Sequence, residues 1–228
     1  MLLEREQSTA RLEAALAAAR RGQGRIVALE GEAGIGKTAL ALSFVSAHRA
    51  DAQVFVGCCE QLTTPEPLGP LRDIERDSGG RFSLSGRSQL ETFAAVLRLL
   101  TSGREPGLLL IEDIHWADDP TLDLLRYLGR RLRTARMLIV TTFRNDEAAS
   151  RDRLAALWGD LPRDTRERIE LQTLSPAAVS ALAARNNHPD TDLYAVTGGN
   201  PFHVTEFLAT DRASVPHSVR DATLARAS

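Results

Sequence analysis

Short runs of apolar residues alternate along the chain with longer segments in which apolar side chains recur every three or four positions. Runs of this length, bounded by glycine, proline or charged residues, predict strands. The third run, GLLLIE, is apolar up to its last residue, which is typical of a strand buried on both faces of a parallel sheet. The predicted strands span residues 25–30, 53–57, 107–112, 136–142 and 168–171.

Helical periodicity fills the segments between these runs. Residues 88–101 carry apolar side chains at helical spacing. A further helix is predicted to begin at Asp119 and Pro120, with the aspartate as N-cap and the proline in the first turn. Helices are also predicted over residues 8–21, 38–49 and 147–158. The alternation of strands and helices predicts an α/β fold, a doubly wound five-stranded parallel sheet with helices on both faces.

Two regions depart from this alternation. Residues 63–74 contain three prolines and are predicted to form a loop, which continues through the glycine- and serine-rich residues 77–86. After residue 175 only helical patterns occur, at 176–185, 190–197, 201–209 and 216–226. We expect an α/β core over residues 1–172 followed by a small all-helical appendage. The last pattern has no terminating signal, so the sequence is expected to end inside a larger protein.

Composition narrows the classes of function. The 228 residues include 28 basic and 30 acidic side chains, a net charge of −2, which gives no electrostatic reason to expect a nucleic-acid-binding surface. No apolar run is long enough for a membrane helix, and the N-terminus lacks the apolar stretch of a signal peptide. The adjacent Cys58 and Cys59 are expected to be free thiols at a strand end. We therefore expect a cytoplasmic protein that contacts neither membrane nor nucleic acid directly.

One basic residue differs from all the others. The chain contains 27 arginines and a single lysine, Lys37. A sequence that uses arginine for its other cations retains lysine where a compact charge on a flexible stem is required.

Lys37 lies in a motif that predicts a phosphate-binding loop. Residues 31–38, GEAGIGKT, match G-x-x-x-x-G-K-[ST] between a predicted strand and a predicted helix. The glycines let backbone N–H groups converge on one anion, and the following helix adds its positive dipole end. Lys37 is expected to reach the β- and γ-phosphates, and the Thr38 hydroxyl to coordinate Mg²⁺. The residues expected to contact the nucleotide here are Glu32, Ala33, Gly34, Ile35, Gly36, Lys37, Thr38 and Ala39.

Two acids follow the apolar run of the third predicted strand. Such a strand end supplies a carboxylate for the Mg²⁺ shell and another that orients water in phosphate-loop enzymes. We assign Glu112 to the metal and Asp113 to the attacking water, and the reverse assignment stays open. Solvation of both acids at a strand tip is the alternative.

Four segments together resemble a known family. GEAGIGKT, LLLIEDIHWADDPTLDLL, LIVTTFR and TGGNPFHVTEFL occur in the order found in signal-transduction ATPases with numerous domains, which are phosphate-loop (P-loop) NTPases. The chain most resembles the N-terminal ATPase region of large LuxR-type transcriptional regulators. The resemblance implies ATP or ADP and Mg²⁺ as ligands, a helical lid over residues 173–214 and the start of a winged-helix segment over residues 215–228.

The resemblance also suggests roles for three residues outside the motifs above. Arg5 lies in an R-E signature near the adenine, or simply begins a surface helix. Arg144 occupies the position of an arginine that senses the γ-phosphate, or is a strand-end surface charge. Pro201 belongs to a G-x-P element that contacts the base, and it also begins a helix. In the segment after Asp113, we expect Trp116 to pack and Asp118 or Asp119 to cap the next helix, while His115 near the γ-phosphate is the weaker alternative.

The leading functional hypothesis is a nucleotide-operated switch that binds and slowly hydrolyses ATP within a multidomain regulator. Its partners would be the C-terminal sensor and effector domains of that protein, with ATP-dependent oligomers as a further expectation. The alternatives are a ring-forming motor ATPase, which needs an arginine finger from a neighbouring subunit, and a nucleotide-binding scaffold without turnover.

Overall fold

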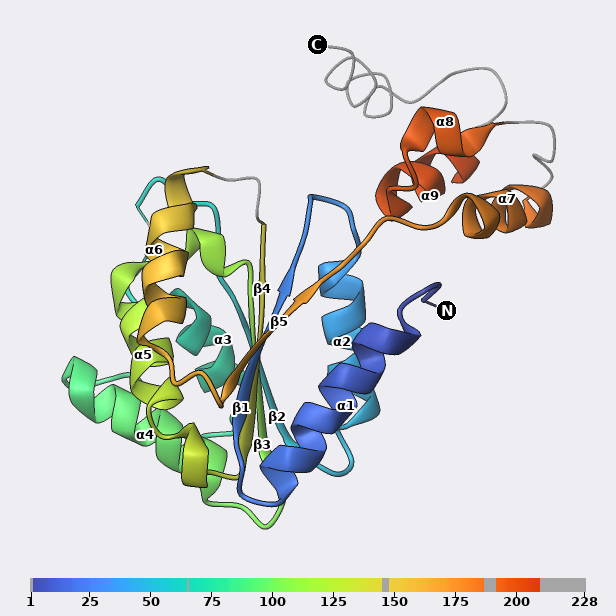
Figure 1. The fold of residues 1–228 in the computed structure, drawn as a ribbon. Helices are drawn as coiled ribbons and strands as arrows, with labels where there is room; N and C mark the ends of the chain where they lie inside the picture. Colours follow the sequence, from blue (N-terminus) through green and yellow to red (C-terminus); the bar gives the residue numbers. More distant parts are fainter. Residues whose placement is uncertain (1, 65, 145–147, 187–191, 210–228) are drawn as a thin grey trace.

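A computed structural model describes residues 2–64, 66–144, 148–186 and 192–209 and contains a five-stranded parallel sheet (Figure 1). The strands lie in the order β2-β3-β4-β1-β5, and each neighbouring pair is parallel. They span β1 Arg25–Glu30, β2 Gln53–Cys58, β3 Gly107–Glu112, β4 Met137–Phe143 and β5 Arg166–Glu170. The predicted α/β fold class is confirmed, with strand bounds within two residues of the predicted ones.

Helices cover both faces of the sheet. Side chains of β1 alternate between them, so that Ile26 packs under α3–α6 and Val27 packs against α1 and α2. This two-sided burial explains why β3 and β4 are buried at every position. The helices are α1 Glu6–Arg20, α2 Lys37–Ala47, α3 Gly69–Asp77, α4 Gln89–Thr101, α5 Asp119–Gly129 and α6 Ala148–Asp160.

Two local predictions were wrong. The proline-rich segment 63–74 does not remain a loop to its end, because α3 begins at Gly69 with Pro70 in its first turn, where no N–H is needed. Leu71 and Ile74 of α3 are buried in the core on that face of the sheet. The N-cap of α5 is not Asp119, as the Asp-Pro pair predicted, but Asp118, the other of the two residues expected to cap this helix. The Asp118 carboxylate accepts hydrogen bonds from the Thr121 hydroxyl and from the Leu68 backbone N–H, so it also anchors the start of α3.

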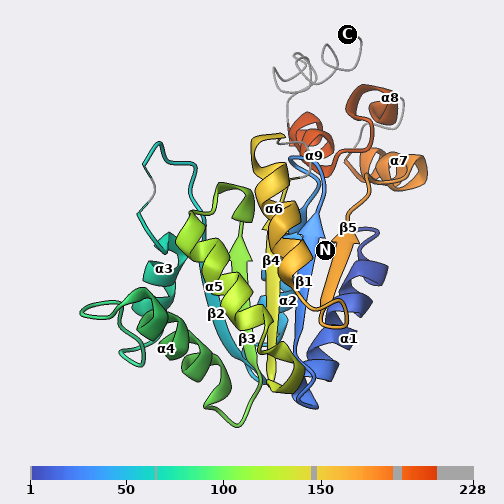
Figure 2. The same ribbon diagram turned by 60° about the vertical axis from the view of Figure 1, so that its left-hand side comes forward.

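The C-terminal part of the described chain is helical, as predicted, and has its own small core. Helices α7 Pro176–Arg185, α8 Leu193–Thr197 and α9 Pro201–Ala209 enclose five buried apolar side chains. They lie beyond the carboxyl ends of the strands (Figures 1 and 2). The boundaries at residues 172 and 214 stay predictions, and the helix predicted at 216–226 and the winged-helix start at 215–228 lie outside the described residues.

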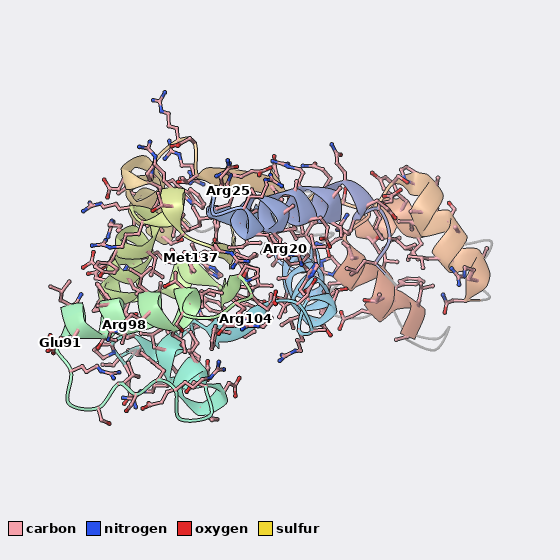
Figure 3. The ribbon with its side chains drawn as sticks, turned by 90° about the horizontal axis from the view of Figure 1, so that it is seen from below. Arg20, Arg25, Glu91, Arg98, Arg104 and Met137 are labelled. Atoms are coloured by element: carbon pink, nitrogen blue, oxygen red, sulfur yellow. The ribbon has the colours of Figure 1, made fainter. Side chains whose placement is uncertain are left out.

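Arginines gather at the opposite edge of the sheet, where the strands begin (Figure 3). The Arg136 guanidinium donates to the backbone carbonyls of Arg20, at 3.3 Å, and Arg104, at 2.6 Å. Arg20 itself pairs with Asp51. The Arg20 carbonyl is at the C-terminal end of α1, where positive charge is favourable. These arginines therefore have structural partners, far from the carboxyl edge of the sheet.

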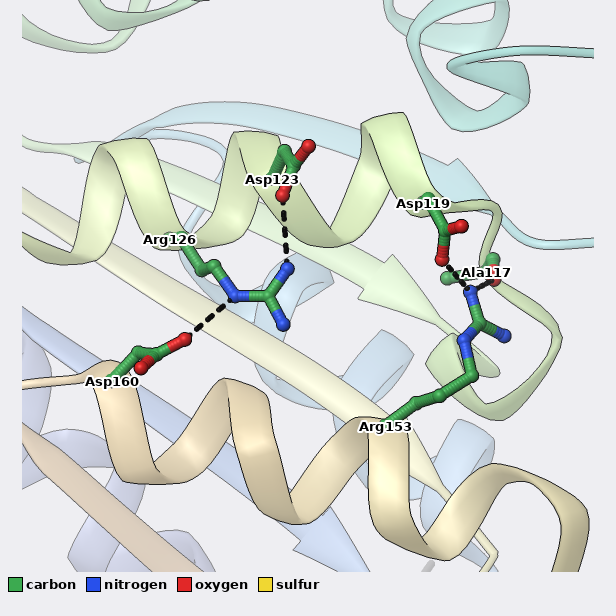
Figure 4. A network of polar contacts seen from close by, with 6 residues as sticks. All are labelled: Ala117, Asp119, Asp123, Arg126, Arg153 and Asp160. Atoms are coloured by element: carbon green, nitrogen blue, oxygen red, sulfur yellow. Dashed lines mark hydrogen bonds and ion pairs between the residues drawn. The ribbon is translucent and has the colours of Figure 1, made fainter.

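Two further arginines fasten α6 to α5 and to the segment that follows β3 (Figure 4). Arg126 bonds Asp123 and Asp160, each at 2.9 Å. Arg153 donates to the Ala117 carbonyl, at 2.8 Å, and to Asp119, at 2.7 Å. Within the described ranges, the helices are too short or too polar to cross a membrane.

Candidate functional site

A cavity of about 600 Å³ lies at the carboxyl edge of the sheet, between the 31–38 loop, the ends of β3 and β4, and the helical lid. Thirteen residues were singled out from the sequence, and all of them except Glu32 and Glu112 line this cavity. The lining residues are Leu2, Leu3, Arg5, Ala33, Gly34, Ile35, Gly36, Lys37, Thr38, Ala39, Asp113, Arg144, Leu174, Leu182, Pro201, Phe202 and Thr205.

The loop between β1 and α2 adopts a conformation suited to an anion. Gly34 and Gly36 have φ angles of 75° and 98°, in the left-handed region that glycine adopts without steric cost. Helix α2 begins at Lys37 directly after Gly36, so the N–H groups of its first turn follow directly on the loop. Successive N–H groups in such a turn form a concave site for phosphate.

The lysine lies across this loop. Lys37 is 7% exposed, and its Nζ donates to the carbonyls of Gly31 and Glu32, each at 2.8 Å. Glu32 thus contributes a backbone carbonyl, while the residue is exposed and is not among those that line the cavity. The expected contact between Glu32 and the nucleotide stays a prediction.

Glu112, the last residue of β3, is hydrogen-bonded to the Thr38 hydroxyl. Burial raises the pKa of the Glu112 carboxyl, the Thr38 bond lowers it, and the neighbouring Asp113 charge raises it again. Among the described residues, no hydrogen-bond partner reaches the buried Glu112 Oε1. A hydroxyl and a carboxylate with an unused oxygen, beside a phosphate-type loop, fit Mg²⁺, which binds proteins through few side chains.

Asp113 faces the cavity from a constrained backbone. Its φ of 53° is left-handed, and its N–H donates to the Thr142 hydroxyl of β4 at 2.8 Å. The buried His115 ring lies 3.8 Å from the Asp113 carboxylate, measured from Nδ1 to Oδ1. His115 does not line the cavity, in contrast to Asp113.

Arg144 follows the end of β4 on the cavity wall. Its guanidinium carbon lies 5.4 Å from the centre of the Trp116 ring, a cation–π distance. Trp116 is partly buried against the core, as predicted for a packing residue.

Arg5 joins the loop to the lid connection. Its Nη2 donates to the carbonyls of Ile35, at 2.9 Å, and Gln172, at 3.0 Å. Burial lowers the pKa of the guanidinium, and the charges of Glu4 and Glu6 act against that shift. Beside it, Glu4 accepts hydrogen bonds from the backbone N–H and the hydroxyl of Ser175, the N-cap of α7.

Sequence reasoning missed the apolar wall of the cavity. Its residues are Leu2, Leu3, Leu174, Leu182 and Phe202. Their spacing indicates helix or core positions, and nothing in the pattern shows that they converge on one cavity from the N-terminus and the lid. Apolar walls with a few polar groups are typical of small-molecule sites.

The comparisons with known proteins identify a matching family and similar folds. The AAA ATPase domain family matches residues 1–140. A search of curated proteins finds no match. The fold is similar to that of the Aeropyrum pernix ORC2 protein, determined as ADPNP–ADP complexes, with a TM-score of 0.66 and 17% identity over 98% of this chain and 68% of that one.

Two further solved structures are similar. CDC6P from Pyrobaculum aerophilum has a TM-score of 0.64 and 16% identity, over 99% of this chain and 64% of that one. A signal-transduction ATPase with numerous domains from Pyrococcus horikoshii, which has a tetratricopeptide repeat sensor, has a TM-score of 0.52 and 20% identity, over 94% of this chain and 32% of that one. The chain thus spans about a third of that multidomain protein.

Proposed function

The chain belongs to the AAA ATPase domain family, and on that premise we propose that it binds MgATP in the cavity and hydrolyses it slowly. We further propose that it is the switch module of a multidomain cytoplasmic regulator of the LuxR-like type, with C-terminal sensor and effector domains as its partners. The single observation that carries the proposal is the shared cavity, whose walls come from the phosphate loop, two strand ends and the lid. A ligand that contacts core and lid stabilises one relative orientation of the two.

Each proposed role follows from a position in the cavity or, for Glu112, from its hydrogen bond with the cavity residue Thr38. The loop N–H groups and Lys37 would bind the phosphates, and the apolar wall with Arg5 and Pro201 would hold the base. Thr38 and Glu112 would hold Mg²⁺, which when bound neutralises charge on the phosphates.

The remaining two polar groups would act at the γ-phosphate. Asp113 faces the cavity and would accept a hydrogen bond from the attacking water, which orients it. Arg144, on the same wall, would bind the γ-phosphate oxygens.

Calorimetry tests the binding step directly. ATP should bind the intact chain with micromolar affinity, more tightly with Mg²⁺ than without it. Lys37→Ala should abolish binding because it removes the ammonium that bonds two carbonyls of the loop. The exposed Arg98→Ala on α4 is the matched control, since it removes a positive charge outside the cavity. Equal affinity in Lys37→Ala and in the intact chain would refute this site.

Turnover and assembly separate the switch from the alternatives. Slow hydrolysis by monomers or loosely associated chains supports the switch. ATP-dependent rings with fast turnover support a motor. A scaffold is supported if the chain binds ATP but its hydrolysis rate is negligible and is unchanged by Asp113→Ala.

A further inference from the structure

We propose that Asn200 is a positioning residue that fastens the lid to the backbone of the phosphate loop, so that the loop's conformation sets the orientation of α9. The inference deepens the proposed switch and rests on it for its biological meaning. It adds a route to the lid that does not pass through Arg144 or through contacts with the base.

The contact joins segments that are far apart in the sequence. Asn200 is 3% exposed, and its Nδ2 donates to the Ala33 carbonyl at 2.9 Å. The Phe202 backbone N–H donates to the Gly34 carbonyl at 3.2 Å. Two consecutive carbonyls of the phosphate loop are therefore bonded to the first turn of α9.

The Asn200 side chain performs two tasks at once. Its Oδ1 accepts the Phe202 N–H at 3.1 Å, which caps the start of α9. Its Nδ2 is then left to face the loop, where the Ala33 carbonyl is an acceptor. The two neighbours fix the orientation of the amide, because one can only donate and the other can only accept.

Gly34 leaves room for this approach. A Cβ at this position would lie 2.7 Å from the Phe202 Cβ and 2.9 Å from the Asn200 Oδ1. Gly34 stands at a variable position of the G-x-x-x-x-G-K-[ST] motif, so the motif does not itself require a glycine there. The lid packs against the loop at the place where the loop lacks a side chain.

A rearrangement of the loop backbone would therefore change the position of the first turn of α9. If the Ala33 and Gly34 carbonyls rotate as the loop closes on phosphates, the acceptors of both bonds move, and the first turn of α9 must follow or detach. The lid responds in this way to occupancy of the phosphate site.

Two substitutions separate the fastening role from the capping role. Asn200→Asp keeps an oxygen that caps the Phe202 N–H but loses the donor to the Ala33 carbonyl. Asn200→Ala loses both. Ser180→Ala, an exposed change on α7, is the matched control within the lid.

Hydrogen–deuterium exchange without nucleotide is the first measurement. The segment 199–205 should exchange about fivefold faster in Asn200→Asp than in the wild type, as expected for the loss of one hydrogen bond. The α7 segment and Ser180→Ala should not change. Exchange that is fast in Asn200→Ala but normal in Asn200→Asp would overturn the proposal, because Asn200 would then be a cap alone.

The second measurement adds ATP or ADP. The difference in α9 exchange between the two nucleotides should fall to less than half in Asn200→Asp, and a full difference would contradict the coupling. A wild type that binds no nucleotide would refute the proposed function, whereas the nucleotide-free comparison would still decide the fastening role. If circular dichroism shows that Asn200→Asp is unfolded, Asn200→Ser, which keeps a capping oxygen but lacks the amide that reaches the Ala33 carbonyl, provides the same comparison, with unchanged exchange as the contrary result.

Discussion

At the scale of single residues, the two adjacent acids at the end of β3 have different surroundings. Glu112 is buried and bonded to Thr38, whereas Asp113 faces the cavity. The order of the residues alone left their roles interchangeable. We propose Glu112 at the metal and Asp113 at the water, because Glu112 is bonded to the hydroxyl that is expected to bind Mg²⁺.

Substitutions of the two acids should therefore have different effects. Glu112→Gln should remove the Mg²⁺-dependent part of the ATP affinity. Asp113→Asn should preserve that affinity and lower kcat by about 100-fold or more, as expected for loss of a general base. Calorimetry and single-turnover hydrolysis measure the two effects separately. Loss of Mg²⁺ dependence in Asp113→Asn would reverse the assignment.

The buried Glu112 should also cost stability. Burial raises the pKa of the Glu112 carboxyl in the folded state, so this carboxyl binds its proton more tightly in the folded protein than in the unfolded chain. The loss of folding free energy is therefore greatest at a pH above the raised pKa, where the buried carboxyl is ionised. Glu112→Gln should raise the Tm at pH 7, and the gain should shrink as pH falls through the raised pKa. Thermal melts between pH 4 and pH 8 measure this. If the rise in Tm were the same at every pH, burial of an ionised Glu112 carboxylate could not be its cause.

The residues that sequence reasoning found are those whose role is local. Lys37 and Thr38 follow from one motif, because the loop conformation is set by consecutive residues. Thr142 and Phe202 were not predicted to take part, since the first accepts a bond from Asp113 and the second contacts Gly34 only after distant segments pack. No local spacing records such contacts.

At the scale of elements, the N-terminal segment joins the phosphate loop to the lid connection. Arg5 bonds the carbonyls of Ile35 and Gln172. One side chain thus sets the distance between the start of α2 and the end of β5.

Arg5→Ala should lower the free energy of unfolding by about 2 kcal/mol, because a buried carbonyl of Ile35 and a partly buried carbonyl of Gln172 lose a charged donor. Arg5→Lys should recover less than half of that loss, since an ammonium lacks the planar fork. Urea unfolding measures both, with the exposed Arg21→Ala at the end of α1 as control. If Arg5→Ala were as stable as Arg21→Ala, the Arg5 hydrogen bonds would make no net contribution to the free energy of unfolding.

Elements with a clear period were predicted well, and α3 was not. Its nine residues include one proline, and two more prolines come shortly before it. These prolines indicated a loop more strongly than the two buried apolar residues, Leu71 and Ile74, indicated a helix. The register of that burial depends on β2, which lies beside α3 only in the folded chain. The strand order is likewise absent from the pattern, because β4 enters the sheet between β1 and β3.

At the scale of the whole molecule, a nucleotide that contacts both core and lid should stabilise the entire chain. ATP at 100 times its Kd contributes about 2.7 kcal/mol. For a chain of this size we expect a rise in Tm of about 5–10 °C. Differential scanning fluorimetry with MgATP measures the shift, which should vanish in Lys37→Ala and persist in Arg98→Ala. A shift of equal size in both variants would indicate binding elsewhere.

The position of β4 in the sheet determines when the site can form during synthesis of the chain. β1 and β3 carry the phosphate loop and the two acids, and each pairs with β4 rather than with the other. A nascent chain that has emerged only as far as β3 cannot close the sheet between them, and long-range parallel pairing is intrinsically slow. The segment through β4, which ends at Phe143, must leave the ribosome before the halves of the site can meet. Before β4 has emerged, the nascent chain exposes the edges of β1 and β3 that will later pair with β4. Chaperones would be needed during this stage of synthesis.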